Sequence, residues 1–367
     1  MKDDHIQIAD KLSTNPLRVP RLNGEYPQSF IDFLKIVYTG EEAAVVKFLN
    51  PIPGFVTSDD IAEKTGIELD EVQKRLDRVR LKNACMGMGN MFCLPPIPIL
   101  LNIHHFYTDI KENDLASIPV YRDFFIDKGY SRYYETSEAG TPVFRAIPIE
   151  ESIRCGQKTL KAEEAHAFIR ESETDDLVLT ACPCRTRAEK AGDRECKDKF
   201  PIASCIMMGM AAVHFESIGV GKRVSKDQAL EYLDEMNKIG MIACTENAET
   251  QNTIICMCCE CCCSQVRGIT RWDNPESIAP SNFIPVTTED CIGCGLCAKR
   301  CFFGALEVDK ETKTVKVEPD KCLGCGVCTF ACKNDALRLE RLERSTPFAS
   351  VGKLMKAFNT ENKKIDI

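Results

Sequence analysis

The chain has 367 residues, a formal net charge of −8, 44% hydrophobic residues and 22 cysteines. This length predicts two or three domains with enough residues to bury their cores, and the acidic balance argues weakly against a nucleic-acid partner. The cysteines are too many for ordinary packing use, and a disulfide framework is unexpected because such frameworks belong to small secreted chains.

The first residues, Met-Lys-Asp-Asp-His, lack the apolar segment of a secretory signal. The longest apolar stretch, residues 92–103, is too short for a membrane-spanning helix and contains Pro95, Pro96 and Pro98. We therefore expect a cytoplasmic protein with reduced cysteines and no membrane span.

Two helices are predicted next. Residues 57–66 have the pattern of a capped helix closed by a glycine, and residues 68–82 place Val72, Leu76 and Val79 on one helical face. Two short helices around a glycine turn are typical of the winged-helix type of helix-turn-helix. The second helix mixes acidic and basic residues, whereas contact with phosphates needs a one-sided basic stripe. We expect a packing module and no nucleic-acid partner, with DNA binding as the less favoured alternative.

The middle of the chain alternates predicted strands and helices. A short buried strand at 177–180 leads into Cys182-Pro-Cys184-Arg185. Cys205 is predicted to begin an apolar helix, where the helix N-terminus would lower the thiol pKa and suit metal ligation. A capped helix at 225–240, followed by strands at 241–244 and 253–255, again has a winged-helix-like order.

The densest cysteine run follows directly. Six of the eight residues from Cys256 to Cys263 are cysteines, and neighbouring side chains point in different directions, so some are expected to be ligands and others packing thiols. Four other cysteines lack local partners and are expected to be small buried residues: Cys85, Cys93, Cys155 and Cys244. Arg185 and Arg187 are expected either to donate hydrogen bonds to metal-bound sulfurs or to be surface charges.

One cysteine spacing, C-x-x-C-x-x-C-x-x-x-C, then occurs twice. Its members are Cys291, Cys294, Cys297 and Cys301, then Cys322, Cys325, Cys328 and Cys332. This spacing holds cubane iron–sulfur clusters, whereas zinc is usually bound by separated C-x-x-C pairs. Such a tight loop needs residues that tolerate positive φ beside the cluster, and four glycines are placed to supply this: Gly293, Gly295, Gly324 and Gly326. We expect two [4Fe–4S] clusters here.

Over residues 286–340 the chain resembles the bacterial dicluster ferredoxin family. The resemblance implies a duplicated βαβ-type fold in which the fourth cysteine of each run serves the other cluster. One cluster would then be held by Cys291, Cys294, Cys297 and Cys332, and the other by Cys322, Cys325, Cys328 and Cys301. The family's usual proline after the fourth cysteine is replaced by Phe302 and Lys333, which removes no ligand.

The upstream cysteines extend this pattern. A C-x-C-R…C…C segment, a C-x-C-C-x-C-C-C segment and the dicluster module are similar to larger prokaryotic ferredoxin-type proteins over residues 145–340. We expect one or two further [4Fe–4S] clusters among the upstream cysteines, with a zinc site or uncoordinated thiols as alternatives. The ten candidates are Cys182, Cys184, Cys196, Cys205, Cys256, Cys258, Cys259, Cys261, Cys262 and Cys263.

The resemblance implies a multi-cluster electron-transfer protein, often from anaerobic metabolism. It does not identify a substrate. No G-x-G-x-x-G follows a predicted strand, so substrate chemistry is expected in a partner oxidoreductase or flavoprotein. Two alternatives remain. A redox-sensing regulator would use the helix-turn-helix as its DNA reader, and a catalytic reductase would use a middle-region cluster with one open iron.

The expected fold class is α+β, arranged as three regions and a tail. Residues 1–150 form a helical, winged-helix-like region, 151–280 a cysteine-rich region, 281–345 a ferredoxin-like region, and 346–367 a C-terminal tail with a helix at 351–358.

Overall fold

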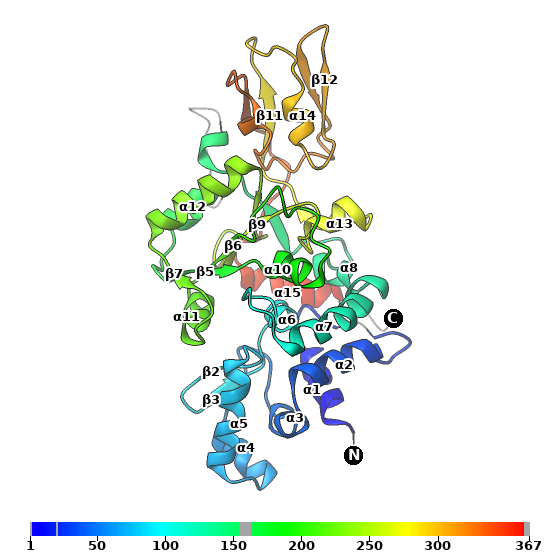
Figure 1. Ribbon diagram of the computed structural model, residues 1–367, viewed down its shortest axis with the longest axis vertical. Coiled ribbons are helices and arrows are strands. Elements are labelled where there is room, and N and C mark those ends of the chain that lie inside the picture. Colours follow the sequence, from blue (N-terminus) through cyan, green and yellow to red (C-terminus); the bar gives the residue numbers. More distant parts are fainter. Residues whose placement is uncertain (1, 20, 154–162, 363–367) are drawn as a thin grey trace.

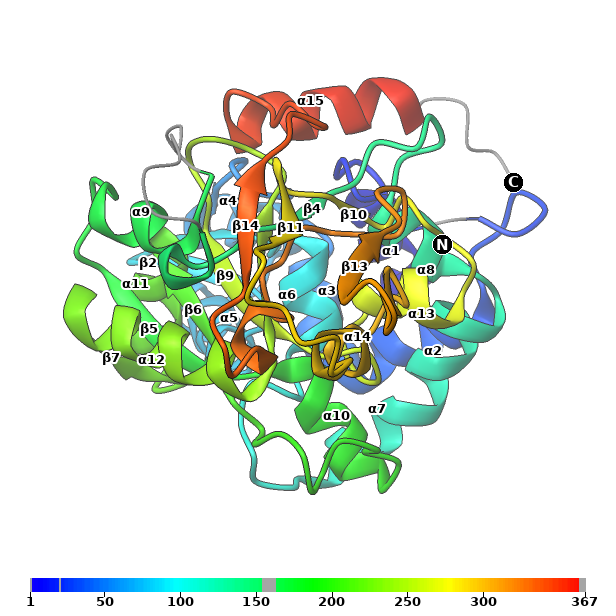
Figure 2. The same cartoon turned by 90° about the horizontal axis from the view of Figure 1, so that it is seen from above.

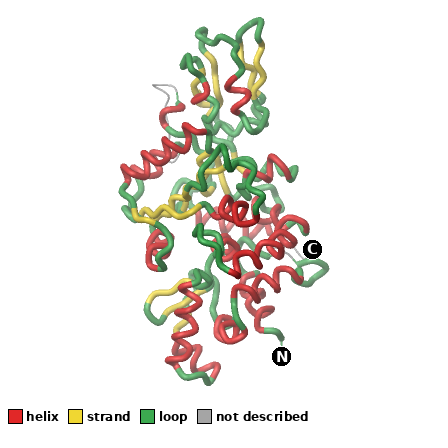
Figure 3. The backbone as a smooth tube through the Cα atoms, viewed as in Figure 1, coloured by secondary structure: helices red, strands yellow, loops and turns green. Residues whose placement is uncertain are grey.

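A computed structural model describes residues 2–19, 21–153 and 163–362. Helices and strands alternate along the chain, which confirms the expected α+β class. Figure 1 shows the N-terminal helices at one end of the long axis, a central sheet, and the strands β11 and β12 at the other end. Helices dominate the N-terminal half of this arrangement, and strands gather in the middle and at the C-terminal region (Figure 3). Among the described residues, no helix is both long and apolar enough to cross a membrane.

The N-terminal region is built from eight α-helices, one π-helical turn and a small sheet. The helices are α1 (Asp4–Leu12), α2 (Gln28–Val37), α3 (Gly40–Val46), α4 (Ser58–Thr65), α5 (Leu69–Leu81), α6 (Ile97–Asn102), α7 (Glu112–Arg122) and α8 (Tyr130–Glu135), and the π-helical turn η1 (Asp123–Asp127) follows α7. The strands β1 (Val56–Thr57), β2 (Met86–Met88) and β3 (Met91–Cys93) form an antiparallel sheet in the order β1-β3-β2.

The two helices predicted from 57–82 are confirmed. The Thr57 side chain accepts a hydrogen bond from the Asp60 N–H, which caps α4, and Gly66 ends the helix with φ +69°. α5 buries Val72, Leu76 and Val79 as its periodicity indicates. The helix pair therefore follows directly from local sequence signals.

The central sheet has seven strands in the order β10-β4-β8-β9-β6-β5-β7. They are β4 (Phe144–Ala146), β5 (Leu177–Ala181), β6 (Ser204–Met208), β7 (Lys222–Arg223), β8 (Ile242–Glu246), β9 (Ile254–Cys258) and β10 (Ile278–Ala279). All pairs are antiparallel except β10 with β4. The accompanying helices are η2 (Glu150–Ser152), α9 (Ala165–Arg170), α10 (Pro183–Ala191), α11 (Met210–Ser217), α12 (Lys226–Ile239) and α13 (Val266–Arg271).

Two expectations for this region are wrong. Cys205 lies inside strand β6, and the helix α11 begins only at Met210. The residues from Cys205 to Met208 are extended because β6 is hydrogen-bonded to β5 on one side and to β9 on the other. The order α12, β8, β9 is as expected, but the two strands do not form a small wing. They lie inside the seven-stranded sheet.

The C-terminal region repeats a strand–helix–strand order. Its elements are β11 (Phe283–Thr287), α14 (Leu296–Arg300), β12 (Leu306–Asp309), β13 (Thr314–Val317), the 3-10 helix η3 (Thr329–Ala331) and β14 (Leu337–Arg341). The strands do not pair in parallel as in a βαβ unit. β11 pairs with β14 and β12 with β13, both antiparallel, so the first pair joins the two halves.

The last helix, α15 (Val351–Glu361), confirms the expected helix in the tail and returns to the N-terminal region. Leu354 and Phe358 are fully buried in the core formed by the N-terminal helices. Arg18 donates from Nη2 to Asn359 Oδ1 at 2.8 Å. Viewed from above, α15 lies along the outer edge of the molecule (Figure 2).

Candidate metal centres

Four cysteines from both repeats line one cavity in the C-terminal region. Cys291 and Cys294 lie on the loop after β11, Cys297 lies in α14, and Cys332 follows η3. They surround a cavity of about 120 Å³, with apolar side chains from β12, β13 and β14 on its walls. The Ala336 N–H donates to Cys332 Sγ at 3.2 Å. N–H donors to sulfur are one of the factors that set the potential of iron–sulfur clusters.

The other four cysteines of the two runs line a second cavity. Cys322, Cys325 and Cys328 come from the second run, and Cys301 comes from the first. Its walls carry apolar residues next to the cysteines. Burial raises the pKa of the Cys325 thiol to about 12. Metal binding at such a thiol must therefore displace its proton.

Glycines of the second run permit a close approach between backbone segments. Gly324 has φ +63°, and a Cβ there would lie 2.3 Å from the Phe283 carbonyl oxygen. Gly326 has φ +78°, and a Cβ there would lie 2.5 Å from Ser152 Oγ. No other residue type could hold the loop against β11 and η2 in this way.

The upstream cysteines gather on one face of the central sheet. Cys205 on β6 and Cys244 on β8 are both register partners of Cys256 on the intervening strand β9. Side chains alternate between the faces of a strand, so Cys258 shares the face of Cys256. Cys182 directly follows β5 and is the N-cap of α10. Three adjacent strands therefore present thiols to the same layer.

Six of these upstream cysteines form a closed series of neighbours, which we call the six-cysteine ring. In order around the ring they are Cys182, Cys184, Cys263, Cys258, Cys256 and Cys205, each close enough to the next, and the last to the first, for their thiols to interact. The Sγ atoms of Cys258 and Cys263 are 3.3 Å apart.

Crowding makes alternate members of the ring acidic. Hydrogen bonds from Cys182 and Cys263 hold the pKa of Cys184 well below its usual value. Hydrogen bonds from Cys182 and Cys256 lower the pKa of Cys205 to about 6. Thiolates are the metal-binding form of cysteine, so the ring offers a thiolate-rich, buried donor set that suits iron or zinc.

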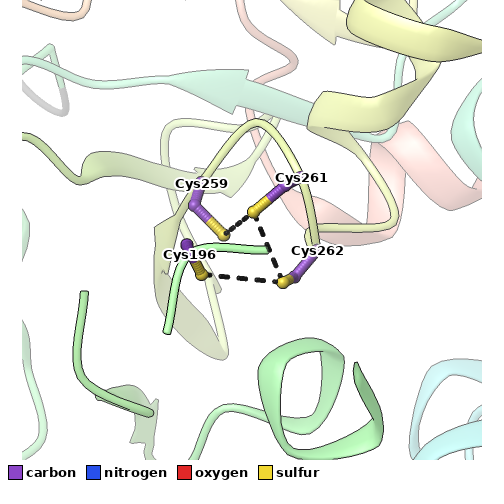
Figure 4. A group of neighbouring side chains, drawn as sticks. All are labelled: Cys196, Cys259, Cys261 and Cys262. Atoms are coloured by element: carbon purple, nitrogen blue, oxygen red, sulfur yellow. Dashed lines mark hydrogen bonds between the residues drawn. The ribbon is translucent and has the colours of Figure 1, made fainter. Parts of the chain in front are cut away.

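A second upstream group lies beyond the end of β9. Cys196, Cys259, Cys261 and Cys262, which we call the quartet, have Sγ atoms that all lie within 4.8 Å of one another. Figure 4 shows the four side chains pointing toward a common centre, with Cys196 approaching from a separate loop. The separations are 3.8 Å for Cys196–Cys262, 3.9 Å for Cys259–Cys261 and 3.5 Å for Cys261–Cys262. The run from 256 to 263 thus divides between two sites.

The structure places the remaining cysteines as follows. Cys244 is fully buried, as expected, and its thiol also lies beside that of Cys258 at the edge of the six-cysteine ring. Only the strand register reveals this, because no spacing in the sequence links residues 244 and 258. Cys85 and Cys93 are buried in the N-terminal region, as expected. Cys155 lies outside the described residues.

Buried arginines surround the upstream sites. Arg185 is fully buried and Arg187 nearly so, which rules out the surface-charge interpretation. Arg185 donates from Nη1 to Cys259 Sγ at 3.6 Å, as expected for a sulfur donor. Arg187 instead donates to Ser264 Oγ at 3.3 Å and stacks over the Tyr121 ring at 3.9 Å.

A cavity of about 660 Å³ opens beside both upstream sites. Cys184 of the ring and Cys261 and Cys262 of the quartet reach its wall. Its other residues are rich in cations, with two carboxylates among them. The charged residues on the wall are Arg122, Arg187, Lys190, Arg267, Arg271, Asp193 and Glu195.

Comparison with known proteins identifies one part of the chain. Residues 290–336 match the family described as 4Fe-4S dicluster domain. An uncharacterized ferredoxin of Methanocaldococcus jannaschii is 32% identical over 83 residues, which are 22% of this chain and 47% of that protein. The chain thus spans about half the length of this curated relative. No solved structure gives a significant match. The C-terminal region is therefore a ferredoxin-type 4Fe-4S domain within a larger protein.

Proposed function

We propose that this protein is a cytoplasmic iron–sulfur electron-transfer protein that exchanges single electrons with a partner oxidoreductase or flavoprotein. The observation that carries the proposal is the sorting of the two cysteine runs into two mixed cavities, each with three cysteines of one run and one of the other. Cys291, Cys294, Cys297 and Cys332 would hold one [4Fe–4S] cluster. Cys322, Cys325, Cys328 and Cys301 would hold the second. When bound, such clusters supply one-electron redox chemistry.

Packing supports an electron path that continues upstream. Cys297 and Cys328, from the two cavities, lie in one hydrophobic cluster with Leu306 and Leu337. From the second cavity, Leu323 and Val327 pack in another cluster with Cys244, Cys258 and Cys263. Apolar side chains that exclude water therefore connect the ferredoxin-type domain to the six-cysteine ring. We propose that the ring holds one further iron–sulfur cluster.

The proposal also covers the organisation of the chain. The regions 1–150, 151–280, 281–345 and 346–367 are proposed as the N-terminal, cysteine-rich, ferredoxin-like and tail segments. β4 lies before residue 150 yet pairs within the central sheet, so the first two segments share a structure. We propose that the winged-helix-like part serves packing, since Arg75 and Arg80 of α5 pair with Glu71 and Asp77 of the same helix.

Single-cysteine variants test the electron-transfer proposal. We expect a reductive titration monitored by EPR to show two one-electron steps from the ferredoxin-type domain. Cys297→Ser should remove or alter one step and Cys328→Ser the other, because each is placed at a different cavity. Cys93→Ser is the matched control, since this buried cysteine lies in the N-terminal region. If both ligand variants titrate like the control, the proposed assignment is wrong.

The cation-rich cavity favours a second candidate, a catalytic reductase for a small anion. It lies beside Cys184 of the ring. Arg271 pairs with Glu195 and Lys190 with Asp114, but Arg122, Arg187 and Arg267 add further positive charge to the wall, which attracts anions. Sulfite, which can accept electrons, is a suitable probe, and inorganic phosphate, which cannot be reduced here, is the control for binding alone. Reoxidation of the reduced protein by sulfite, followed by EPR, absent with phosphate and lost in Arg187→Met, would support catalysis. Unchanged spectra with both anions would contradict the second candidate and leave electron transfer as the proposed function.

A further inference from the structure

The quartet differs from every other cysteine group in how tightly its sulfurs are packed. Within the described residues, it is the one group of three or more His, Cys, Asp or Glu residues whose ligand atoms all lie within 4.8 Å of one another. By the same measure, the sulfurs around the two ferredoxin-type cavities and around the six-cysteine ring are more widely spaced. The separation between sulfurs depends on what they bind.

A single tetrahedral ion requires close sulfurs. With metal–sulfur bonds of about 2.3 Å, the edge of a tetrahedron of four sulfurs is about 3.8 Å. Three sulfur–sulfur separations in the quartet, 3.8, 3.9 and 3.5 Å, scatter around this edge length. In a cubane, each cysteine binds a different iron, so the four sulfurs lie about 6 Å apart. The quartet therefore fits one ion and is too small for a cubane.

We propose that Cys196, Cys259, Cys261 and Cys262 bind one Zn²⁺ ion in a closed structural site. Four thiolates leave no open position for a substrate, as in structural zinc sites. Their excess negative charge has nearby compensation, because Arg185 donates to Cys259 and the positive charge of Arg194 lies close to Cys196. The ion would be redox-inert, so the quartet would not belong to the electron path.

The position of the quartet gives the ion a structural task. Cys196 lies on the loop between α10 and β6, and the other three ligands follow β9. The ion would therefore fasten this loop to the segment that also supplies Cys258 and Cys263 to the six-cysteine ring. Phe200, at the end of the loop, is buried in the same core as Cys196, Cys259 and Cys262.

The experiment uses the full chain purified anaerobically from zinc- and iron-containing medium. Elemental analysis should find one zinc per chain besides iron. X-ray absorption at the zinc edge should show four sulfur ligands at about 2.3 Å. Cys261→Ser should change the zinc ligand set to three sulfurs and one lighter atom, or lose the zinc, with iron and acid-labile sulfide unchanged. Cys93→Ser should retain the full zinc signal.

Several results would overturn the proposal. One is wild-type protein without zinc, whether the quartet is then empty or holds iron. A mononuclear iron in the quartet would be recognised by the EPR of high-spin ferric iron in the oxidised protein. Another is a matched loss of about four iron and four sulfide in Cys261→Ser, which would indicate a cubane. Because zinc content is measured separately from iron and sulfide, failure here is distinct from failure of the electron-transfer proposal.

Discussion

Arg185 is the residue that connects the two upstream sites. Its guanidinium is fully buried, donates from Nε to the Ile202 carbonyl at 2.5 Å, and reaches Cys259 of the quartet. Burial alone would lower the pKa of Arg185, but the charges of Cys182 and Cys259 outweigh it and raise the pKa. A buried charge needs such partners to be tolerated. One cation therefore offsets thiolates of both the ring and the quartet.

Replacing this cation should weaken both sites. We expect Arg185→Met to lower the free energy of unfolding by about 1.5–3 kcal/mol, the range for hydrogen bonds to charged groups, and to speed metal loss to a chelator. Arg185→Lys keeps the charge but not the fork of donors. Its stability and its rate of metal loss should therefore fall between those of the wild type and Arg185→Met. Thermal unfolding and timed chelation under anaerobic conditions measure both effects. Wild-type rates in Arg185→Met would contradict this role.

Glu135 predicts a pH dependence of stability. Burial raises its pKa to about 9, and its Oε2 accepts a hydrogen bond from Asn274 at 3.1 Å. Between the usual carboxyl pKa and about 9, the folded state keeps a proton that the unfolded state releases. The free energy of unfolding therefore falls as pH rises, by up to about 1.4 kcal/mol per pH unit from this group.

The variant Glu135→Gln removes this titration while preserving the shape of the protonated side chain. We expect it to be more stable than the wild type, by a margin that grows from pH 5 to pH 8. Urea unfolding at several pH values provides the comparison. A constant difference across that range would show that Glu135 is ionised in the folded protein.

At the scale of elements, α10 is anchored to the N-terminal region by a buried ion pair. Lys190, near the end of α10, donates to Asp114 of α7 at 2.9 Å, and both side chains are almost completely buried. Burial alone would raise the pKa of Asp114, but hydrogen bonds from His104, Lys190 and Tyr107 hold it well below its usual value. Because Cys182 is the N-cap of α10, this pair also steadies the six-cysteine ring.

Removing one partner of the pair leaves a buried charge. We expect Asp114→Asn to lower the free energy of unfolding by about 3–5 kcal/mol. Glu71→Gln is the control, because Glu71 and Arg75 form a partly exposed pair on the surface of α5 and such pairs contribute little. Denaturant unfolding of both variants decides the matter. Equal, small effects would mean that the buried pair is as weak as the surface one.

Elements set by local sequence signals could be predicted, and those that depend on strand register could not. The helices α4, α5, α12 and α15 follow from caps and periodicity, and the ferredoxin-type domain follows from a repeated cysteine spacing. The division of the 256–263 run could not be predicted, because it depends on where β9 ends and on its register against β6 and β8. Cys205 was misplaced for the same reason, since an apolar run of this length suits a helix or a buried strand.

In the whole molecule, the last helix, α15, packs against the N-terminal region. Phe358 is fully buried among the N-terminal helices, so Phe358→Ala should destabilise the protein by about 3–5 kcal/mol through the cavity it leaves. Lys356→Ala on the exposed face of α15 is the control. Iron content should stay unchanged in both, because α15 contributes no cysteine. Stability is measured by thermal unfolding, and iron content by elemental analysis. If Phe358→Ala unfolds at the same midpoint temperature as the wild type, α15 does not stabilise the N-terminal region.

Each of the two cavities in the C-terminal region is lined by three cysteines of one run and one of the other. This arrangement is the main support for electron transfer through [4Fe–4S] clusters. The most direct test is the content of iron and acid-labile sulfide in anaerobically purified full-length protein. The account predicts iron and sulfide in near-equal amounts, about eight of each from the ferredoxin-type domain alone, with more if the six-cysteine ring holds a cluster. Protein that carries zinc but no iron or acid-labile sulfide would contradict it.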